Sequence, residues 1–361
     1  MTKVKQLDFT GTTIFCGLDV HKVSWRVNIR DSELELHDFT QPADPVVLHN
    51  HLTKNYPGAK YKAAYEAGFC GFGIQRQLSE LGIECVLLNA ADIPKGDKER
   101  RQKNDKRDAR SISDLISSKK KDINFLYVPT PAWEHARTLV RNRQQQISDS
   151  TRCKCRIWHL LHFSSLAAPN KADVGSYWSR KFIQKLEEMD CGGSLELKAA
   201  LQIKLQDYLH KRDLLLQSTR AIRHLCKQEA YKQPMELILS IPGIGEINGA
   251  IILFEIQNIH RFKTFDNLCS YVGLIPDTDD SGETKRNKGL THRRNTYLRE
   301  ALIESGWVLV KKDPAMLMKY KEYCKRMHKN KAIIRITRHL LARISYVLKN
   351  EQPYVSGLLA G

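Results

Sequence analysis

The stretch TIFCGLDV, residues 13–20, decides the fold of the first part of the chain. It is an apolar run of strand length that ends in a single carboxylate, Asp19. An isolated charge at a buried strand end is energetically costly unless it has a partner or a ligand. The run therefore predicts a buried strand that carries Asp19 to a functional edge of a sheet.

The sequence around this strand predicts an α/β domain. Residues 25–30 and 34–40 have the patterning of two further strands, 44–55 that of a helix, and 60–66 that of a strand ending at Glu66. A helix near 74–81 and a short apolar strand at 83–88 follow. Three strands in a meander, followed by alternating strands and helices, are an α/β pattern.

A second pair of carboxylates lies in the basic run at 95–110. A helix is expected from about Asp105 to Ser118, and Asp105 and Asp108 are three residues apart, so they share one face of it. The alternative is that these acids are simply scattered over the surface. For Asp105 and Asp108 alone, this alternative is the favoured one. Asp19 and Glu66 at strand ends favour a functional site instead, because all four carboxylates can then converge. Converging carboxylates repel one another and need divalent cations. Mg²⁺ prefers such oxygen ligands, and a pair of ions can clamp a scissile phosphate.

The rest of the chain is expected to be mostly helical. We predict three domains, namely 1–130, a helical pair at 131–232, and 233–361. The segment from Trp133 to about Leu161 lacks Pro and Gly, and Tyr208, Leu215 and Ile222 repeat at intervals of seven in the second helical stretch, 194–230. These features predict an antiparallel coiled coil.

Charge indicates the class of partner. The chain has 58 Lys+Arg against 40 Asp+Glu, a net charge of +18. Residues 1–94 contain 9 Lys/Arg and 11 Asp/Glu, so this part is net −2 and the remainder is net +20. Such an excess favours nucleic acid as the partner. No apolar run approaches about 18 residues, the start is too polar for a signal peptide, and nine irregularly spaced cysteines suit a reducing cytoplasm, so we expect no membrane partner.

Two glycine-containing segments in the last domain are candidate phosphate sites. Ile241-Pro-Gly-Ile-Gly245 lies between the apolar helical runs 235–240 and 247–256, as in a helix-hairpin-helix. There Gly243 and Gly245 would let backbone N–H groups approach a phosphate, although a tight turn without a ligand is the alternative. Ser281-Gly282 precedes a stretch without acids from Lys285 to Arg299. A serine there is a candidate nucleophile, whereas spacing alone favours a simple turn. The candidate basic contacts are Lys285, Arg286, Lys288, Arg293, Arg294 and Arg299, with Arg141, Arg143 and Arg152 on the long polar helix.

Several segments together carry a family likeness. They include GLDVHK at 17–22, YEAGFCGFG at 65–73, NDKRDAR at 104–110, LVRNRQQQISDSTRCKCRIWHLLH at 139–162, SIPGIGEINGAIILFEI at 240–256, and YVGLIP at 271–276 with KGLTHRRNTYLREALIESG at 288–306. In this order and spacing the chain resembles the insertion-sequence 110 family of transposases, also called DEDD transposases, which are related to Piv-type DNA invertases.

The resemblance implies properties that the residues alone do not. The first domain should have the RNase H-like fold of Holliday-junction resolvases, with Asp19, Glu66, Asp105 and Asp108 as a Mg²⁺-binding tetrad. Ser281 should be the nucleophile of a 5′-phosphoserine intermediate, with Ser270 as a rival. The protein should act on target and donor DNA as a homo-oligomer guided by a structured RNA, in the cytoplasm of a prokaryote at the nucleoid. A metal-dependent structure-specific nuclease and a non-catalytic nucleic-acid-binding protein are the alternatives.

Overall fold

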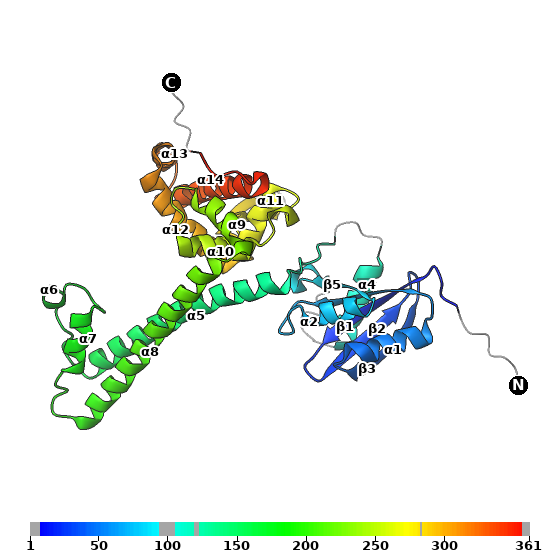
Figure 1. Cartoon of the computed structure of the whole chain (residues 1–361), viewed down its shortest axis with the longest axis horizontal. Helices are drawn as coiled ribbons and strands as arrows, with labels where there is room; N and C mark the ends of the chain where they lie inside the picture. The colour runs from blue at the N-terminus through cyan, green and yellow to red at the C-terminus, as the bar shows by residue number, and fades with distance from the viewer. Residues whose placement is uncertain (1–7, 94–104, 119–122, 282–283, 356–361) are drawn as a thin grey trace, which may run out of the picture. The chain divides into compact units, whose positions relative to one another are not determined.

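The computed structural model describes residues 8–93, 105–118, 123–281 and 284–355, with only the backbone described over 278–288 (Figure 1). The chain divides into two compact units, Met1–Val128 and Pro129–Gly361. Each unit has its own hydrophobic clusters. No helix in the described part of the chain is both long and apolar enough to cross a membrane.

The first unit is a five-stranded sheet with helices on both faces. The strand order is β3-β2-β1-β4-β5, where β1, β2 and β3 form an antiparallel meander and β4 and β5 run parallel to β1. The elements are β1 (Thr13–Val20), β2 (Ser24–Arg30), β3 (Glu35–Pro42), α1 (Pro45–Asn55), β4 (Lys60–Glu66), α2 (Gly73–Glu80), β5 (Glu84–Leu88), the 3₁₀ helix η1 (Ala90–Asp92) and α4 (Asp105–Ser117). The predicted α/β architecture and its strand meander are confirmed.

Alternation along β1 determines which face each residue occupies. Ile14, Cys16 and Leu18 are fully buried in the cluster that includes α1 and α2 residues. The intervening residues face the opposite side, where α4 packs. Asp19 shares this α4 face with Gly17. Glu66 lies on the same face. Leu18 of β1 pairs with Tyr65 of β4 in the parallel register, so the next residues along the two strands, Asp19 and Glu66, point to the same side.

Gly17 allows α4 to lie directly on the sheet. A Cβ at this position would meet the backbone oxygen of Ala109 and would lie 2.5 Å from the backbone nitrogen of Ser113. The Ser113 hydroxyl donates a buried hydrogen bond of 2.6 Å to Oδ1 of Asn28 on β2. This close contact holds the start of α4, and with it Asp105, at the end of β1.

The second unit begins with two long helices, α5 (Pro131–Phe163) and α8 (Leu195–Cys226). They are antiparallel, because Arg143 bonds Thr219 near one end and Cys153 bonds Asp207 farther along. Between them lie α6 (Lys171–Val174) and α7 (Arg180–Glu187). The remaining elements are α9 (Glu229–Leu239), α10 (Glu246–Ile256), η2 (Ile259–Arg261), α11 (Phe265–Val272), β6 (Pro276–Ser281), β7 (Thr284–Leu290), α12 (Thr296–Lys312), α13 (Pro314–Cys324) and α14 (Lys329–Asn350).

The helical pair and the C-terminal helices share a hydrophobic core. Ala136 and Val140 of α5 and Ile222 of α8 are buried in the same cluster as α9, α10, α12 and α14. Among the residues that the structure describes, one cluster thus extends from the helical pair into the C-terminal helices, and the domain boundary at 232 stays a prediction. Pro234, close to this boundary, lies inside α9.

Candidate functional site

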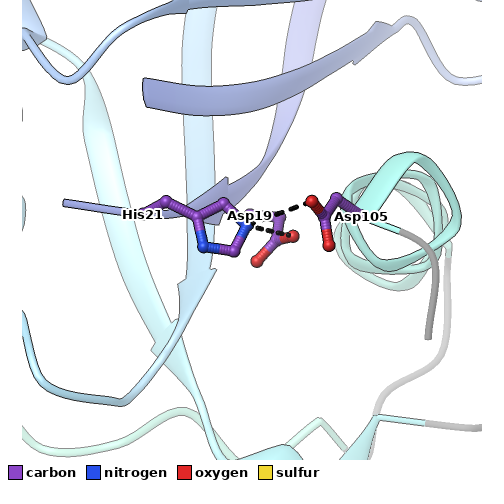
Figure 2. Close-up of side chains that lie close together, drawn as sticks. All are labelled: Asp19, His21 and Asp105. Atoms are coloured by element: carbon purple, nitrogen blue, oxygen red, sulfur yellow. Dashed lines mark ion pairs between the residues drawn. The ribbon is translucent and has the colours of Figure 1, made fainter. Parts of the chain in front are cut away.

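Three side chains meet at the end of β1 (Figure 2). Nε2 of His21 lies 3.2 Å from Oδ2 of Asp19 and 3.4 Å from Oδ2 of Asp105. One potential ligand atom from each of the three residues falls within 4.8 Å of the others. The Asp19 side chain is 17% exposed and that of His21 40%, so the group is open to solvent on one side.

The local sequence explains this meeting. Asp19 and His21 are two residues apart, a spacing that places side chains on the same side of an extended chain. Asp105 is the first residue of α4, one turn before Ala109, the residue that contacts Gly17. The sheet and the helix thus bring together carboxylates that are 86 residues apart in the sequence.

Glu66 and Asp108 have positions consistent with a wider cluster. Glu66 is the half-buried last residue of β4, next to β1, and Asp108 is half-buried on α4. Among the residues that the structure describes, neither belongs to the close group of Asp19, His21 and Asp105. The full four-carboxylate site therefore remains a prediction.

His21 was missed by the sequence reasoning, although it lies within the quoted GLDVHK segment. The signal that could have identified it is the Asp-x-His spacing at the end of an apolar strand. A neutral imidazole nitrogen is a metal ligand, and a protonated one neutralises carboxylates. A protonated Nε2 between the two carboxylates would reduce the repulsion between Asp19 and Asp105.

Ion pairs fasten α4 to the edge of the meander. Arg110 contacts Glu35 with two nitrogens, at 2.7 and 2.8 Å. Lys106 lies 3.1 Å from Asp38, which also accepts a contact of 2.6 Å from Arg26. At the far end of α4, Asp114 pairs with Arg30. These contacts fix the rotation of the helix that presents Asp105.

These ion pairs predict that acid weakens the attachment of α4. The hydrogen bond from Arg110 lowers the pKa of Glu35. Burial raises the pKa of Asp38, but Arg26 and Lys106 outweigh it, so this pKa is also lowered. Both carboxyl groups have lower pKa values in the folded protein than in the unfolded chain, where the value is about 4. Their ion pairs therefore contribute fully to stability above about pH 4, and this contribution is lost as the pH falls through the folded pKa values. Hydrogen exchange at α4 amides, followed by mass spectrometry, should increase relative to the core strands below about pH 4.

The matched variant for this pH prediction is Glu35→Gln, which keeps the side-chain size and removes the titrating group. Its α4 amides should exchange faster at neutral pH, and the additional increase in acid should be smaller than in the parent protein. Equal acid sensitivity in both proteins would show that the Arg110 pair does not hold the helix.

The candidate nucleophile lies in a β-hairpin of the second unit. Ser281 ends β6, and its backbone stands opposite Thr284 of β7. The side chains of Ser281, Lys285, Arg286 and Lys288 lie outside the described part of the structure. The rival Ser270 is exposed on α11, where its carbonyl oxygen accepts the N–H of Gly273.

The two glycines of the predicted helix-hairpin-helix have different environments. Gly243 is buried with a φ of +96°, and a Cβ there would lie 2.7 Å from the backbone nitrogen of Leu309 on α12. This glycine lets α12 pack closely, and its role as a phosphate contact stays a prediction. Gly245 is exposed at the N-cap of α10, has no atom near its Cβ position, and remains a candidate.

Arg293 and Arg294 are exposed on an anchored backbone. The N–H of Thr291 donates to the carbonyl of Ile275, and the N–H of Asn295 to that of Tyr271, each at 3.1 Å. Arg299 donates to the carbonyl of Thr291 at 3.1 Å and so braces the same segment. This arrangement suits two arginines that contact a phosphate, with Arg299 behind them.

Arg141 has a structural partner. Its guanidinium donates two hydrogen bonds, of 2.6 and 2.8 Å, to the fully buried carboxylate of Glu255 on α10. Asn295 donates to the same carboxylate at 2.7 Å. Arg141 therefore has a structural partner, while its side chain stays 37% exposed, and its role in nucleic-acid binding stays a prediction.

The two other predicted arginines of α5 also contact protein groups. Arg143 donates to Thr219 at 2.9 Å, and the largely exposed Arg152 contacts Asp149 at 2.8 Å. Neither contact buries a carboxylate, so both arginines remain candidates for nucleic-acid contact.

Two family models match the chain. One, for an IS110 transposase of DEDD type, matches residues 16–165, which include Asp19, Glu66, Asp105 and Asp108. The other, described as transposase IS116/IS110/IS902 family, matches residues 235–321, which include Gly245 and Ser281. The matches therefore cover both places where the sequence predicts chemistry.

Curated relatives span most of the chain. A putative transposase, y4rJ, of Sinorhizobium fredii is 27% identical over 77% of this chain and 74% of its own length. The transposase for insertion sequence element IS1533 of Leptospira borgpetersenii is 22% identical over 81% of this chain and 84% of its own. The transposase for IS1111A of Coxiella burnetii is 21% identical over 65% and 62%.

Proposed function

Because the chain belongs to the IS110/IS116 family of insertion-sequence transposases, we propose that it cleaves and exchanges DNA strands with a carboxylate metal centre and a serine nucleophile. The observation that carries the proposal is the meeting of Asp19 and Asp105 beside His21. The strand order of the first unit, with its antiparallel meander and two parallel strands, supports an RNase H-like fold for the domain that holds this centre.

The residues at the end of β1 fit a divalent cation. Asp19 and Asp105 offer oxygen donors of the kind that Mg²⁺ prefers, and their separation suits ligands of one ion. Glu66 and Asp108 complete the proposed tetrad, and His21 orients the two nearer carboxylates. A bound cation would neutralise charge at the scissile phosphate.

The serine step assigns the covalent chemistry to Ser281. Its Oγ attacks the DNA phosphorus, and the bond from phosphorus to O3′ breaks as the bond to Oγ forms. The products are a 5′-phosphoserine and a DNA end with a free 3′-hydroxyl. A serine hydroxyl needs a base or a cation to become a nucleophile, and Arg293 and Arg294 hold the phosphate. The position of Ser281 in the hairpin that leads into this basic segment supports the assignment.

A Ser281→Ala protein should form no covalent adduct with DNA. The assay incubates the protein with labelled DNA that carries the element's ends, with its RNA and Mg²⁺, and separates adducts on a denaturing gel. Ser270→Ala is the matched control and should form the adduct at the parental level. Cleavage without an adduct by Ser281→Ala would instead indicate a nuclease that uses water, and an adduct formed by Ser281→Ala would contradict the serine assignment.

The resemblance supports two further parts of the proposal. The protein binds a structured RNA, encoded by the flank of its element, that pairs with target and donor DNA. It acts as a homo-oligomer in the prokaryotic cytoplasm. The net charge of +18 suits a partner of RNA together with DNA.

A further inference from the structure

The last two helices carry positive charge that the proposed cleavage chemistry does not use. Residues 311–350 contain 12 Lys/Arg and 2 Asp/Glu, a net charge of +10 within a chain of net +18. The segment includes α13 and α14, which pack against each other (Figure 1). A local excess of this size attracts a polyanion.

One face of α14 is buried and the other forms a basic and aromatic stripe. Ile333, Ile336 and Leu340 are among the residues that face the core. The opposite face presents, at helical spacing, Arg335, His339, Ala342, Arg343, Tyr346 and Lys349. This stripe contains no acidic residue.

A cavity of about 570 Å³ lies along this stripe, between α14, the first half of α13 and the segment 352–355. Its volume is within the range of small-ligand sites. Its lining includes Lys319 from α13, His339, Arg343 and Tyr346 from α14, and Tyr354.

The wall of the cavity is fixed in place. The guanidinium of Arg343 stacks over the Tyr354 ring at 4.6 Å and contacts Asp313 at 2.7 Å. The backbone N–H of Tyr354 donates to the hydroxyl of Ser240 at 2.7 Å. The segment that closes the cavity is thus tied to both α14 and α9.

The cavity offers an aromatic surface next to cations. Tyr346 is 59% exposed, and Ala342, one turn before it, leaves space beside the ring. Burial, together with the charges of Lys319 and Arg343, lowers the pKa of His339. Aromatic rings next to cations bind unpaired bases, because the base stacks and the flanking phosphates are neutralised.

We propose that the cavity between α13 and α14 binds an unpaired nucleotide of a single-stranded nucleic-acid segment, with its base against Tyr346 and a phosphate near Lys319. Bases in a duplex are stacked on one another and offer no free face to the tyrosine. The inference rests on the proposed function only in requiring that the protein handles nucleic acid, and it uses no residue of the metal centre.

The first test compares Ala342→Glu with Ala199→Glu. Both replace a solvent-exposed helical alanine with a good helix former and change the net charge equally. The full-length proteins are titrated into fluorescein-labelled oligodeoxythymidine or oligouridine of about 12 nucleotides, and anisotropy is measured. Ala342→Glu should bind at least one of these probes about tenfold more weakly, and Ala199→Glu should match the parent within about twofold. Equal affinity of the two variants for both probes would overturn the proposal, and the more tightly bound probe identifies DNA or RNA as the source.

The second test isolates stacking. Tyr346→Ala should weaken binding of the single-stranded probe about tenfold and leave binding of a duplex of the same length unchanged, while Tyr346→Phe keeps the parental affinity. Phe163→Ala, which removes another exposed aromatic ring, is the matched control and should have no effect. An equal loss for single strand and duplex would overturn the base-stacking assignment. An Asp19→Asn protein should bind these probes like the parent, so failure at this cavity and failure of the metal centre are separable.

Discussion

Replacing Asp19 with asparagine should lower the rate of DNA cleavage by about a thousandfold, equal to about 4 kcal/mol of transition-state stabilisation. Asparagine keeps the size of the side chain but removes the charge that would hold the cation of the proposed centre. In the structure this carboxylate shares the His21 nitrogen with Asp105. The measurement is single-turnover cleavage of labelled element ends at saturating Mg²⁺.

The same substitution should not destabilise the fold. Two carboxylates that face one imidazole repel each other, and removing one relieves that repulsion. The melting temperature of Asp19→Asn should therefore equal or exceed that of the parent, even though activity is lost. Asp114→Asn is the matched control, since it removes the same charge from the opposite end of α4, where Asp114 pairs with Arg30. Cleavage by Asp19→Asn at the parental rate, or an equal loss in Asp114→Asn, would refute the metal role of Asp19.

Replacing Glu255 with alanine should destabilise the second unit by about 1–3 kcal/mol, because the partly buried Arg141 and Asn295 lose their shared acceptor. Glu255 has no exposed surface and receives hydrogen bonds from Arg141 and Asn295. Burial together with the charge of Arg141 lowers the pKa of Arg137, and without the carboxylate of Glu255 the repulsion between these two cations would be less compensated. Urea unfolding of the full chain, followed by circular dichroism, measures the effect.

A double variant distinguishes the ion pair from simple packing at Glu255. Glu255→Met combined with Arg141→Met replaces both charges with flexible apolar side chains, and such replacements of buried pairs are often neutral or stabilising. The double variant should recover most of the stability lost in Glu255→Ala. If Glu255→Ala unfolds at the same urea concentration as the parent, the pair does not stabilise the unit.

The strands and helices of the first unit could be predicted because their signals are local. The apolar run at 13–20, the strand that ends at Glu66 and the helix that begins at Asp105 agree with the observed bounds of β1, β4 and α4. Alternation and helical spacing also placed Asp19 and Asp105 on elements that can converge. These patterns depend on near neighbours in the sequence and need no knowledge of tertiary contacts.

The roles that could not be predicted depend on distant partners. The sequence predicts that Gly243 binds a phosphate, and only the structure shows that α12 packs against its Cα. The sequence predicts a surface cation at Arg141, and only the structure shows that it pairs with the buried Glu255, 114 residues away. A lone glutamate in the apolar run IILFEI is a signal for such a buried pair, and it identifies Arg141 only once the fold is known.

The contact at Gly17 has a consequence for how the family can diverge. The separation of Asp19 and Asp105 is set by main-chain atoms of α4 resting on main-chain atoms of β1, without a side chain between them. Substitutions that spare this contact and the ion pairs of α4 should therefore leave the separation of Asp19 and Asp105 unchanged, even among relatives that share only 21–27% identity with this chain. A natural homologue with a larger residue in place of this glycine would have to hold its helix farther out, and it should have lost transposition.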